Sequence, residues 1–306
     1  MKLARERACP ICDALPGNPL FRPAHSPGPV ARCQQCGLVY VSPIEQDQVI
    51  ITTPRLEHDP AILTSADPRL LSGCWETAQL PMKRAEWPAL RRNAANALRR
   101  IERYRPPPGR LLDVGCGWGF FLTAARQRGW EPAGLEPLAG HAIYARATTG
   151  AAVLTDVLHD DSFPTESFDA VTAFQVFEHL PDPAGDLQRL WRFLKPGGIL
   201  LIEVPNIATW SVALLGKRHR HFVPDHLTFF SPRTLRALLE KHGFEVLEVY
   251  RPTRWMTLRH LFGHWGRRLL GRPPAPTRPA RAPGLHRLVV PVNLGDIVGA
   301  IARKRA

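Results

Sequence analysis

The chain has 306 residues, 44% of them hydrophobic and 22% charged, which is typical of a globular protein with one large domain and an appendage. No leader-like apolar segment opens the sequence and no run of about 18 uncharged apolar residues occurs, so we expect a cytoplasmic protein without membrane spans. The net charge of +13 is concentrated in residues 251–306, where 12 Lys and Arg face a single acid, Asp296. The main body is therefore not the polycationic surface of a general nucleic-acid binder.

Residues 1–45 contain two cysteine pairs, spaced CxxC, twenty residues, CxxC. The pairs are Cys9 with Cys12 and Cys33 with Cys36. Four thiolates with this spacing can hold Zn²⁺. So short a segment needs a metal crosslink of this kind because it is too small to bury a stabilising hydrophobic core. We predict a structural zinc ribbon. Few basic and aromatic side chains surround the cysteines, so nucleic acid is a disfavoured partner.

Scattered prolines and the lack of periodic signals predict a connector over residues 46–82. The next domain, over residues 83–306, begins with a pattern typical of an amphipathic helix. The apolar face of this helix consists of Trp87, Leu90, Ala94, Leu98 and Ile101.

Short apolar runs then alternate with helical patterns, which predicts an α/β fold whose parallel sheet is covered on both faces. The predicted strands are 110–114, 131–135, 152–155, 168–174 and 199–204, with helices at 120–128 and 185–194. Ser231 and Pro232 are typical of a helix start, and strands at 244–250 and 294–304 follow. If these two strands pair antiparallel, residues 251–294 form a basic insertion between them.

A glycine-rich loop follows the first of these strands. It places Asp113, Gly115, Gly117 and Gly119 in the pattern DxGxGxG. A dinucleotide fingerprint would need its third glycine at Phe120, so a nicotinamide cofactor is disfavoured. A ligand without phosphates, such as S-adenosylmethionine, can use the same close approach to the backbone.

Acidic side chains follow the next two strands, Glu136 after the second and Asp156 after the third. Ligands of open α/β sheets bind outside the carboxyl ends of the strands. Glu136 could therefore accept both ribose hydroxyls, and Asp156 could bind an adenine amino group.

The segments LLDVGCGWG, GLEP, FDAVTAFQVFEHLPDP and LKPGGILLIEVPN resemble the class I S-adenosylmethionine-dependent methyltransferases over about residues 83–250. The resemblance implies a Rossmann-like sheet of seven strands, mostly parallel, with the last two antiparallel. It also implies that Glu136 binds the ribose and that Asp156 and Val157 bind the adenine. The residues implied at the methionine end are Asp113, Gly115, Cys116, Gly117 and Gly119. The two cysteine pairs resemble ribbons fused to bacterial methyltransferases of small molecules or glycans.

The segment QVFEH resembles the corresponding part of the ubiquinone O-methyltransferases, in which a Glu, a second Glu and a His bind a divalent cation in some members. Glu178 and His179 match the second and third positions, but Gln175 replaces the first carboxylate. Because a hard cation depends on that charge, we predict no cation there. We predict instead that Gln175 contacts the cofactor.

Two histidines are candidates for a catalytic base or for positioning the acceptor. His179 follows the fourth strand, where the methyl group is expected, and His226 lies in the pattern PxHLxFFS, which is also familiar in this group. An alcohol or phenol acceptor benefits from a base with a pKa near 7, whereas a carboxylate needs none.

The basic insertion has apolar residues at helical spacing between residues 255 and 270. They are Trp255, Leu258, Phe262, Trp265 and Leu269. Such a helix could contact a membrane surface peripherally or cover the substrate, but Gly263 and Gly266 favour a helix packed on the domain.

These observations predict transfer of a methyl group from S-adenosylmethionine to a small molecule, a sugar or other glycan, or a lipid-linked intermediate, with oxygen favoured as the acceptor. A sugar C-methyltransferase is the alternative enzyme. A nucleic-acid-binding zinc ribbon with a vestigial cofactor fold is the alternative of another class.

Overall fold

The structure is a computed structural model that describes residues 6–23, 26–44, 84–258, 261 and 288–305. The predicted connector, residues 46–82, lies outside these residues, as does most of the basic insertion. In the part of the chain that is described, no helix is both long enough and apolar enough to cross a bilayer.

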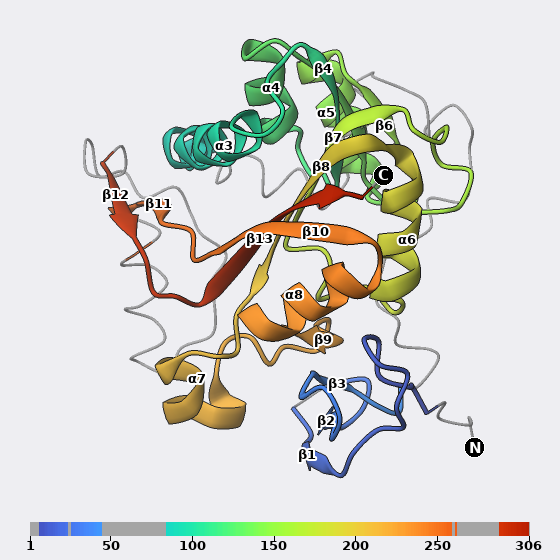
Figure 1. The fold of residues 1–306 in the computed structure, drawn as a ribbon. Helices are drawn as coiled ribbons and strands as arrows, with labels where there is room; N and C mark the ends of the chain where they lie inside the picture. Colours follow the sequence, from blue (N-terminus) through green and yellow to red (C-terminus); the bar gives the residue numbers. More distant parts are fainter. Residues whose placement is uncertain (1–5, 24–25, 45–83, 259–260, 262–287, 306) are drawn as a thin grey trace.

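The central sheet has seven strands in the order β10-β13-β8-β7-β4-β5-β6 (Figure 1). Their bounds are β4 Gly109–Val114, β5 Trp130–Leu135, β6 Ala152–Leu154, β7 Phe168–Phe174, β8 Leu194–Pro205, β10 Phe244–Tyr250 and β13 Ile297–Lys304. All are parallel except β13, which runs antiparallel to both of its neighbours. The predicted Rossmann-like sheet with its antiparallel final pair is confirmed.

Helices cover both faces of this sheet, as a parallel sheet requires. Their bounds are α3 Trp87–Glu102, α4 Phe120–Gln127, α5 Ala139–Thr149, α6 Pro183–Phe193 and α8 Pro232–Lys241. Side chains of α3 and α4 pack with Leu111 and Leu201 on one face, and those of α6 and α8 pack with Leu112 and Leu200 on the other. Neighbouring strand residues point to opposite faces, so the continuous apolar runs read from the sequence are those of strands buried on both sides.

The start of α8 follows the sequence prediction. The Ser231 hydroxyl accepts a hydrogen bond from the Thr234 N–H, the Thr234 side chain accepts one from the Ser231 N–H, and Pro232 stands at the first position. This capping box fixes where the helix begins.

The N-terminal segment forms a second, smaller sheet that does not stand alone. Its strands β1 Pro19–Phe21, β2 Val30–Arg32 and β3 Val39–Val41 pair antiparallel, and β9 Thr228–Phe229 adds to β3. Because β9 comes from the loop before α8, the cysteine-rich segment is attached to the larger domain through shared backbone hydrogen bonds (Figure 1).

The insertion begins and ends as a β-ribbon. Strand β11 Arg254–Thr257 pairs antiparallel with β12 Val289–Val292. A helix beginning at Trp255 was expected, and for residues 255–257 this prediction is wrong. The Asn93 side chain bonds the Trp255 N–H at 2.7 Å and its carbonyl at 3.0 Å, and Trp255 pairs with Pro291, so tertiary contacts override the helical spacing. Phe262, Trp265 and Leu269 lie outside the described residues.

A short helix, α7 Trp210–Leu215, and a 3₁₀ turn over Gly216–Arg218 follow β8 without a counterpart in the sequence prediction. None of the residues of α7 is buried. A helix without a buried face has no apolar periodicity in its sequence, so the pattern could not predict it.

Candidate active site and cysteine cluster

The glycine loop connects β4 to α4 through residues with positive φ. Gly115, Gly117 and Gly119 have φ of 71°, 52° and 75°. A Cβ on Gly115 would lie 2.6 Å from Val176, and one on Gly119 would lie 2.8 Å from Thr149, whereas a Cβ on Gly117 would meet nothing within 4 Å. Gly115 and Gly119 therefore permit close packing of the protein itself, and Gly117 leaves open space beside the loop.

Glu136, which follows β5, holds this loop in place. Its carboxylate accepts hydrogen bonds from the Gly117 N–H at 2.8 Å and the Leu138 N–H at 3.0 Å. The side chain is almost completely buried, with His141 Nδ1 3.6 Å from one oxygen. A carboxylate has about four lone-pair sites, so two remain for a ligand.

A cleft of about 450 Å³ opens along the carboxyl ends of β4, β5 and β7. Six of the predicted residues line it: Gly115, Glu136, Asp156, Val157, Gln175 and His179. Other lining residues, including Leu135, Leu138, Leu158 and Leu180, make it largely apolar. The structure thus brings residues from four separate segments to one cavity of the size that small ligands occupy.

Five other predicted residues lie outside the lining of the cleft: Asp113, Cys116, Gly117, Gly119 and His226. Cys116 packs with Leu122 and Ala142 in a small apolar cluster. Its Sγ stands where a Cβ on Gly134 would fall, so this thiol faces the core. The adjacent backbone, not the thiol, is the part of residue 116 that belongs to the loop.

Asp113 is buried at the end of β4 and accepts a hydrogen bond from the Thr172 hydroxyl at 2.7 Å. Burial raises its pKa to about 7, and the neighbouring Glu136 carboxylate adds to the effect. The side chain can therefore change its charge near neutral pH.

Gln175 occupies a strained position after β7, with φ of 56°. Both its backbone N–H and its side-chain Nε2 donate to the Glu203 carbonyl, at 2.8 and 3.1 Å. The backbone N–H and one of the two Nε2 hydrogens are thus directed to β8, which leaves the other Nε2 hydrogen and the side-chain carbonyl able to face a ligand.

A cluster of three side chains stands at the end of the cleft: Glu178, His179 and His226. Their potential ligand atoms all lie within 4.8 Å of one another. His179 Nδ1 is 2.9 Å from the Asp225 carbonyl, and His226 Nδ1 is 2.9 Å from the His221 carbonyl. Donation from each Nδ1 leaves each Nε2 as an acceptor.

The surroundings of Glu178 and of His226 favour their uncharged forms. Burial, with a smaller contribution from the Asp225 carboxylate, raises the pKa of Glu178 to about 8. Burial, with the adjacent His179, lowers the pKa of His226 to about 4. His226 is therefore neutral at pH 7.

The sequence interpretation matched Glu178 and His179 to a cation-binding pattern, but it did not predict that His226 lies beside them. Neither carboxylate oxygen of Glu178 has a hydrogen-bond partner within the described structure, although the side chain is only 1% exposed. Two imidazole nitrogens beside an unpartnered carboxylate could hold a divalent cation of the zinc or manganese kind. We predicted that no cation binds here because Gln175 replaces a carboxylate, and the absence of a cation stays a prediction.

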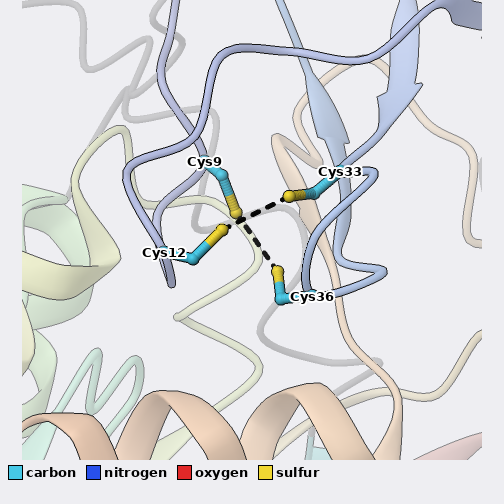
Figure 2. A group of neighbouring side chains, drawn as sticks. All are labelled: Cys9, Cys12, Cys33 and Cys36. Carbon is cyan, nitrogen blue, oxygen red and sulfur yellow. Dashed lines mark hydrogen bonds between the residues drawn. The ribbon is translucent and has the colours of Figure 1, made fainter.

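The four cysteines of the N-terminal segment converge from two loops (Figure 2). Cys9 Sγ lies 3.4 Å from Cys36 Sγ, and Cys12 Sγ lies 3.3 Å from Cys33 Sγ. All four sulfurs lie within 4.8 Å of one another. The cluster predicted from their spacing is therefore formed.

The two cysteine loops have the same backbone geometry despite different sequences. In each, the N–H of the residue after the second cysteine bonds the carbonyl of the first: Asp13 to Cys9 at 2.9 Å and Gly37 to Cys33 at 3.0 Å. Both residues have positive φ, 59° for Asp13 and 80° for Gly37. Aspartate tolerates this region better than most residues, so the first loop forms without a glycine.

Arg7 connects the cysteine-rich segment to both histidine-bearing loops. Its guanidinium donates to the carbonyls of Leu180 and Leu227 and to the Thr228 hydroxyl, at 3.2 to 3.4 Å. The Glu178 carbonyl in turn accepts from the Leu227 and Thr228 N–H groups, at 2.7 and 3.1 Å. The segments that carry His179 and His226 are thus held together by the N-terminal segment.

Comparison with known proteins assigns the family. A model of methyltransferase domains matches residues 87–249, more than half of the chain. The ubiquinone biosynthesis O-methyltransferase of Colwellia psychrerythraea is 29% identical over 153 residues, 45% of this chain and 62% of the relative. The enzyme of the same name from Pseudomonas aeruginosa is 30% identical over 155 residues, 46% of this chain and 66% of the relative. The chain thus spans less than two thirds of the length of these relatives.

Two solved structures share the fold. One is a complex of the Haloferax volcanii Trm112 methyltransferase activator with a putative methyltransferase (TM-score 0.51, 19% identity, 78% of this chain and 97% of that chain). The other is a putative methyltransferase from Bacillus halodurans (TM-score 0.50, 18% identity, 69% of this chain and 100% of that chain). These structures show the same fold, and the match of the family model over residues 87–249 shows that the chain belongs to the family of methyltransferase domains.

Proposed function

We propose that the protein transfers a methyl group from S-adenosylmethionine to an oxygen atom of a small molecule, a glycan or a lipid-linked intermediate. One observation carries the proposal: Gly115, Glu136 and Asp156, each following a different parallel strand, line one cleft that also reaches His179. The ubiquinone O-methyltransferases among the relatives support oxygen as the acceptor.

The cleft and the glycine loop beside it have the groups that the cofactor needs. On the loop, outside the lining of the cleft, Gly117 leaves room for the methionine moiety, and Asp113 at the base of the loop can supply a negative charge for the ammonium group. Two free lone-pair sites of Glu136 suit the two ribose hydroxyls. Asp156 and the exposed Val157 flank the position proposed for the adenine.

When bound, S-adenosylmethionine supplies an electrophilic methyl group on a sulfonium, so the protein mainly aligns the acceptor and excludes water. His179 lines the cleft, and its Nε2 is free to accept the proton of a hydroxyl acceptor. His226, behind it, orients that ring by an edge-to-face contact of 4.8 Å between ring centroids. The lowered pKa of His226 makes it a weak base.

The cysteine cluster fits a structural zinc ion. Four Zn–S bonds of about 2.3 Å in a tetrahedron separate the sulfurs by about 3.8 Å. The sulfurs here bracket that spacing, from 3.3 Å up to a limit of 4.8 Å. Four thiolates leave no open position, so the ion would stabilise the ribbon rather than react. Free thiols of this kind suit a reducing compartment, which supports a cytoplasmic location.

Calorimetry on the zinc-loaded full chain tests the cofactor. We expect binding of S-adenosylmethionine with a Kd on the order of 10 µM. Absence of binding contradicts the enzyme proposal. It would leave the nucleic-acid-binding ribbon as the alternative, which requires salt-sensitive binding of RNA or DNA that is lost in the double variant Cys33→Ser and Cys36→Ser.

Mass spectrometry of extracts incubated with methyl-labelled S-adenosylmethionine tests the acceptor. A methyl ether or ester in the product supports O-methylation, whereas a new C–C bond would show a sugar C-methyltransferase.

The histidine cluster can be tested separately. We expect His179→Ala to lower kcat by about 10²-fold or more without changing cofactor affinity. Metal analysis of the wild type distinguishes a base from a cation site, because the base predicts only the zinc of the ribbon. A second equivalent of metal, lost in Glu178→Gln, would overturn the prediction of a cation-free site.

A further inference from the structure

A second cavity, of about 440 Å³, opens on the same carboxyl edge of the sheet, between α3, the end of β8 and the segment that follows β10. Its lining is strongly basic. The arginines are Arg99, Arg100 and Arg103 of α3 with Arg251 and Arg254 of the following segment, and the one acid is Glu203. Five guanidinium groups therefore share a concave surface with a single carboxylate.

Three of these arginines are held in place by acids. Arg254 pairs with Glu203, and Arg100 and Arg103 both pair with Glu248, which stands beside the cavity on β10. Arg100 also lies over the Tyr250 ring, 3.9 Å from its centroid. Their orientation is thus fixed before any ligand binds, which lowers the entropic cost of binding.

The other two arginines provide unneutralised charge. Within the described residues, neither Arg99 nor Arg251 has an ion-pair partner; Arg99 donates only to the Asn96 side chain. The Arg251 backbone is anchored, because its carbonyl accepts from Asn293 Nδ2 at 3.2 Å. A positive pocket with fixed walls attracts anions more strongly than scattered surface charges do.

The basic cavity adjoins the cofactor cleft. Glu203 lines the basic cavity, and its carbonyl accepts both hydrogen bonds of Gln175, which lines the cleft. The two linings thus meet through adjacent strand ends, although Ala97 of the basic cavity packs on the α3 face of the sheet and Leu190 of the cleft packs on the α6 face. A ligand could place an anionic group in the first while presenting its acceptor atom toward the second.

We propose that the basic cavity binds the phosphate or diphosphate group of the methyl acceptor, so that the substrate class is a phosphorylated or diphosphate-linked compound. The inference rests on the proposed methyl transfer. Arginine forks match phosphate oxygens in pairs, and the cavity has the volume of an ordinary ligand site. Stabilisation of the C-terminus of α3 explains Arg99, Arg100 and Arg103, but not the convergence of Arg251 and Arg254 from a different segment.

Calorimetric titration of the full zinc-loaded chain with inorganic diphosphate, at a constant ionic strength of about 0.15 M to limit surface screening artefacts, tests this site. We expect Arg99→Gln and Arg251→Gln each to weaken diphosphate binding about tenfold or more, because each removes a charge-assisted hydrogen bond. Arg91→Gln is the matched control. It removes the same charge from an exposed position of α3 outside the cavity, and its affinity should stay within twofold of the wild type.

Titration of S-adenosylmethionine into the same variants separates the two proposals. If the wild type binds S-adenosylmethionine but does not bind diphosphate, the inference is overturned and the methyltransferase proposal stands. Equal loss of diphosphate affinity in Arg91→Gln, or equal affinity for sulfate and diphosphate, also overturns it, because the attraction would then be general. Uridine diphosphate and geranyl diphosphate as further probes distinguish a nucleotide-linked from a lipid-linked acceptor, whichever binds more tightly than diphosphate itself.

Discussion

The cofactor cleft and the histidine cluster lie at the same edge of one sheet, but they are assembled in different ways. The cleft takes its residues from the ends of consecutive strands, β4, β5, β6 and β7, each in a short motif. The cluster joins His179 to His226, 47 positions further along, and Arg7 of the N-terminal segment holds their loops together. The cleft should therefore depend on local chain geometry, and the cluster on the ribbon.

Removing the cysteines should give the largest effect and separate the two regions. In the double variant Cys33→Ser and Cys36→Ser the ribbon loses two ligands of the proposed zinc ion and, with that ion, the support of β9. We expect a loss of several kcal/mol of ribbon stability and loss of turnover, while S-adenosylmethionine still binds. Zinc content, hydrogen exchange of residues 226–230 and calorimetry check this. Cys116→Ala is the control: it removes a buried thiol far from the ribbon in sequence, and the variant should keep its zinc. If the double variant also loses cofactor binding, the two regions are not independent.

Glu136→Ala should act on the opposite region. The change removes the acceptor for the Gly117 and Leu138 N–H groups as well as the proposed ribose contacts. We expect cofactor affinity to fall by about 3 kcal/mol, roughly 100-fold, and zinc content to remain unchanged. Glu131→Gln, at an exposed position of β5, is the control. An unaltered Kd in Glu136→Ala would remove Glu136 from the cofactor site.

Arg7→Met tests the connection between the regions. The side chain is partly buried, and desolvation lowers its pKa to about 10 while leaving it charged at pH 7. Its loss removes one donor each from the Leu180 carbonyl, the Leu227 carbonyl and the Thr228 hydroxyl, of which Leu227 keeps the bond from the Val41 N–H, at a cost of about 2 kcal/mol in unfolding free energy. We expect kcat to fall at least tenfold with an unchanged Kd for the cofactor. Arg32→Met changes an exposed residue of β2 and should alter neither kcat nor the Kd of the cofactor. If Arg7→Met changes the cofactor Kd as well as kcat, the role of Arg7 is not limited to the histidine loops.

The pH dependence of cofactor binding tests Asp113. Burial raises its pKa to about 7, above the usual aspartate value. The folded chain thus binds more protons than the unfolded chain between about pH 4 and 7, so stability contributed by this group falls as pH rises through that window. The ammonium of S-adenosylmethionine prefers the ionised form. Affinity should therefore increase from pH 6 to pH 8, by about threefold to tenfold, and the dependence should disappear in Asp113→Asn; an identical profile in that variant would exclude Asp113.

Two glycine substitutions should give the smallest and most local effects. Gly117→Ala imposes only the cost of positive φ, about 1 kcal/mol, and fills the space proposed for the methionine moiety. Gly119→Ala also forces its Cβ against Thr149 and Ala145. We expect Gly117→Ala mainly to weaken cofactor binding and Gly119→Ala mainly to lower the melting temperature. If Gly119→Ala mainly weakened cofactor binding and Gly117→Ala mainly lowered the melting temperature, Gly117 would not face the ligand.

Local signals made most of the sheet predictable. Apolar runs, the Ser231–Pro232 helix start and the glycine loop each require only neighbouring residues, and the strands they predict match those of the structure within a few residues. The failure at Trp255 has a clear cause. A spacing typical of a helix was overridden by the Asn93 side chain, which lies 162 positions away in the sequence.

The sequence by itself determined the fold class, the family resemblance and the two sets of residues that lie close along the chain, the glycine loop and the CxxC pairs. Tertiary structure alone decided that β9 extends the ribbon, that Glu178 is buried beside two histidines without a hydrogen-bond partner among the described residues, and that arginines from α3 and residues 251–254 meet in one cavity. Motif spacing records constraints between neighbours along the chain. Contacts between distant segments depend on how whole elements pack, which no local pattern encodes.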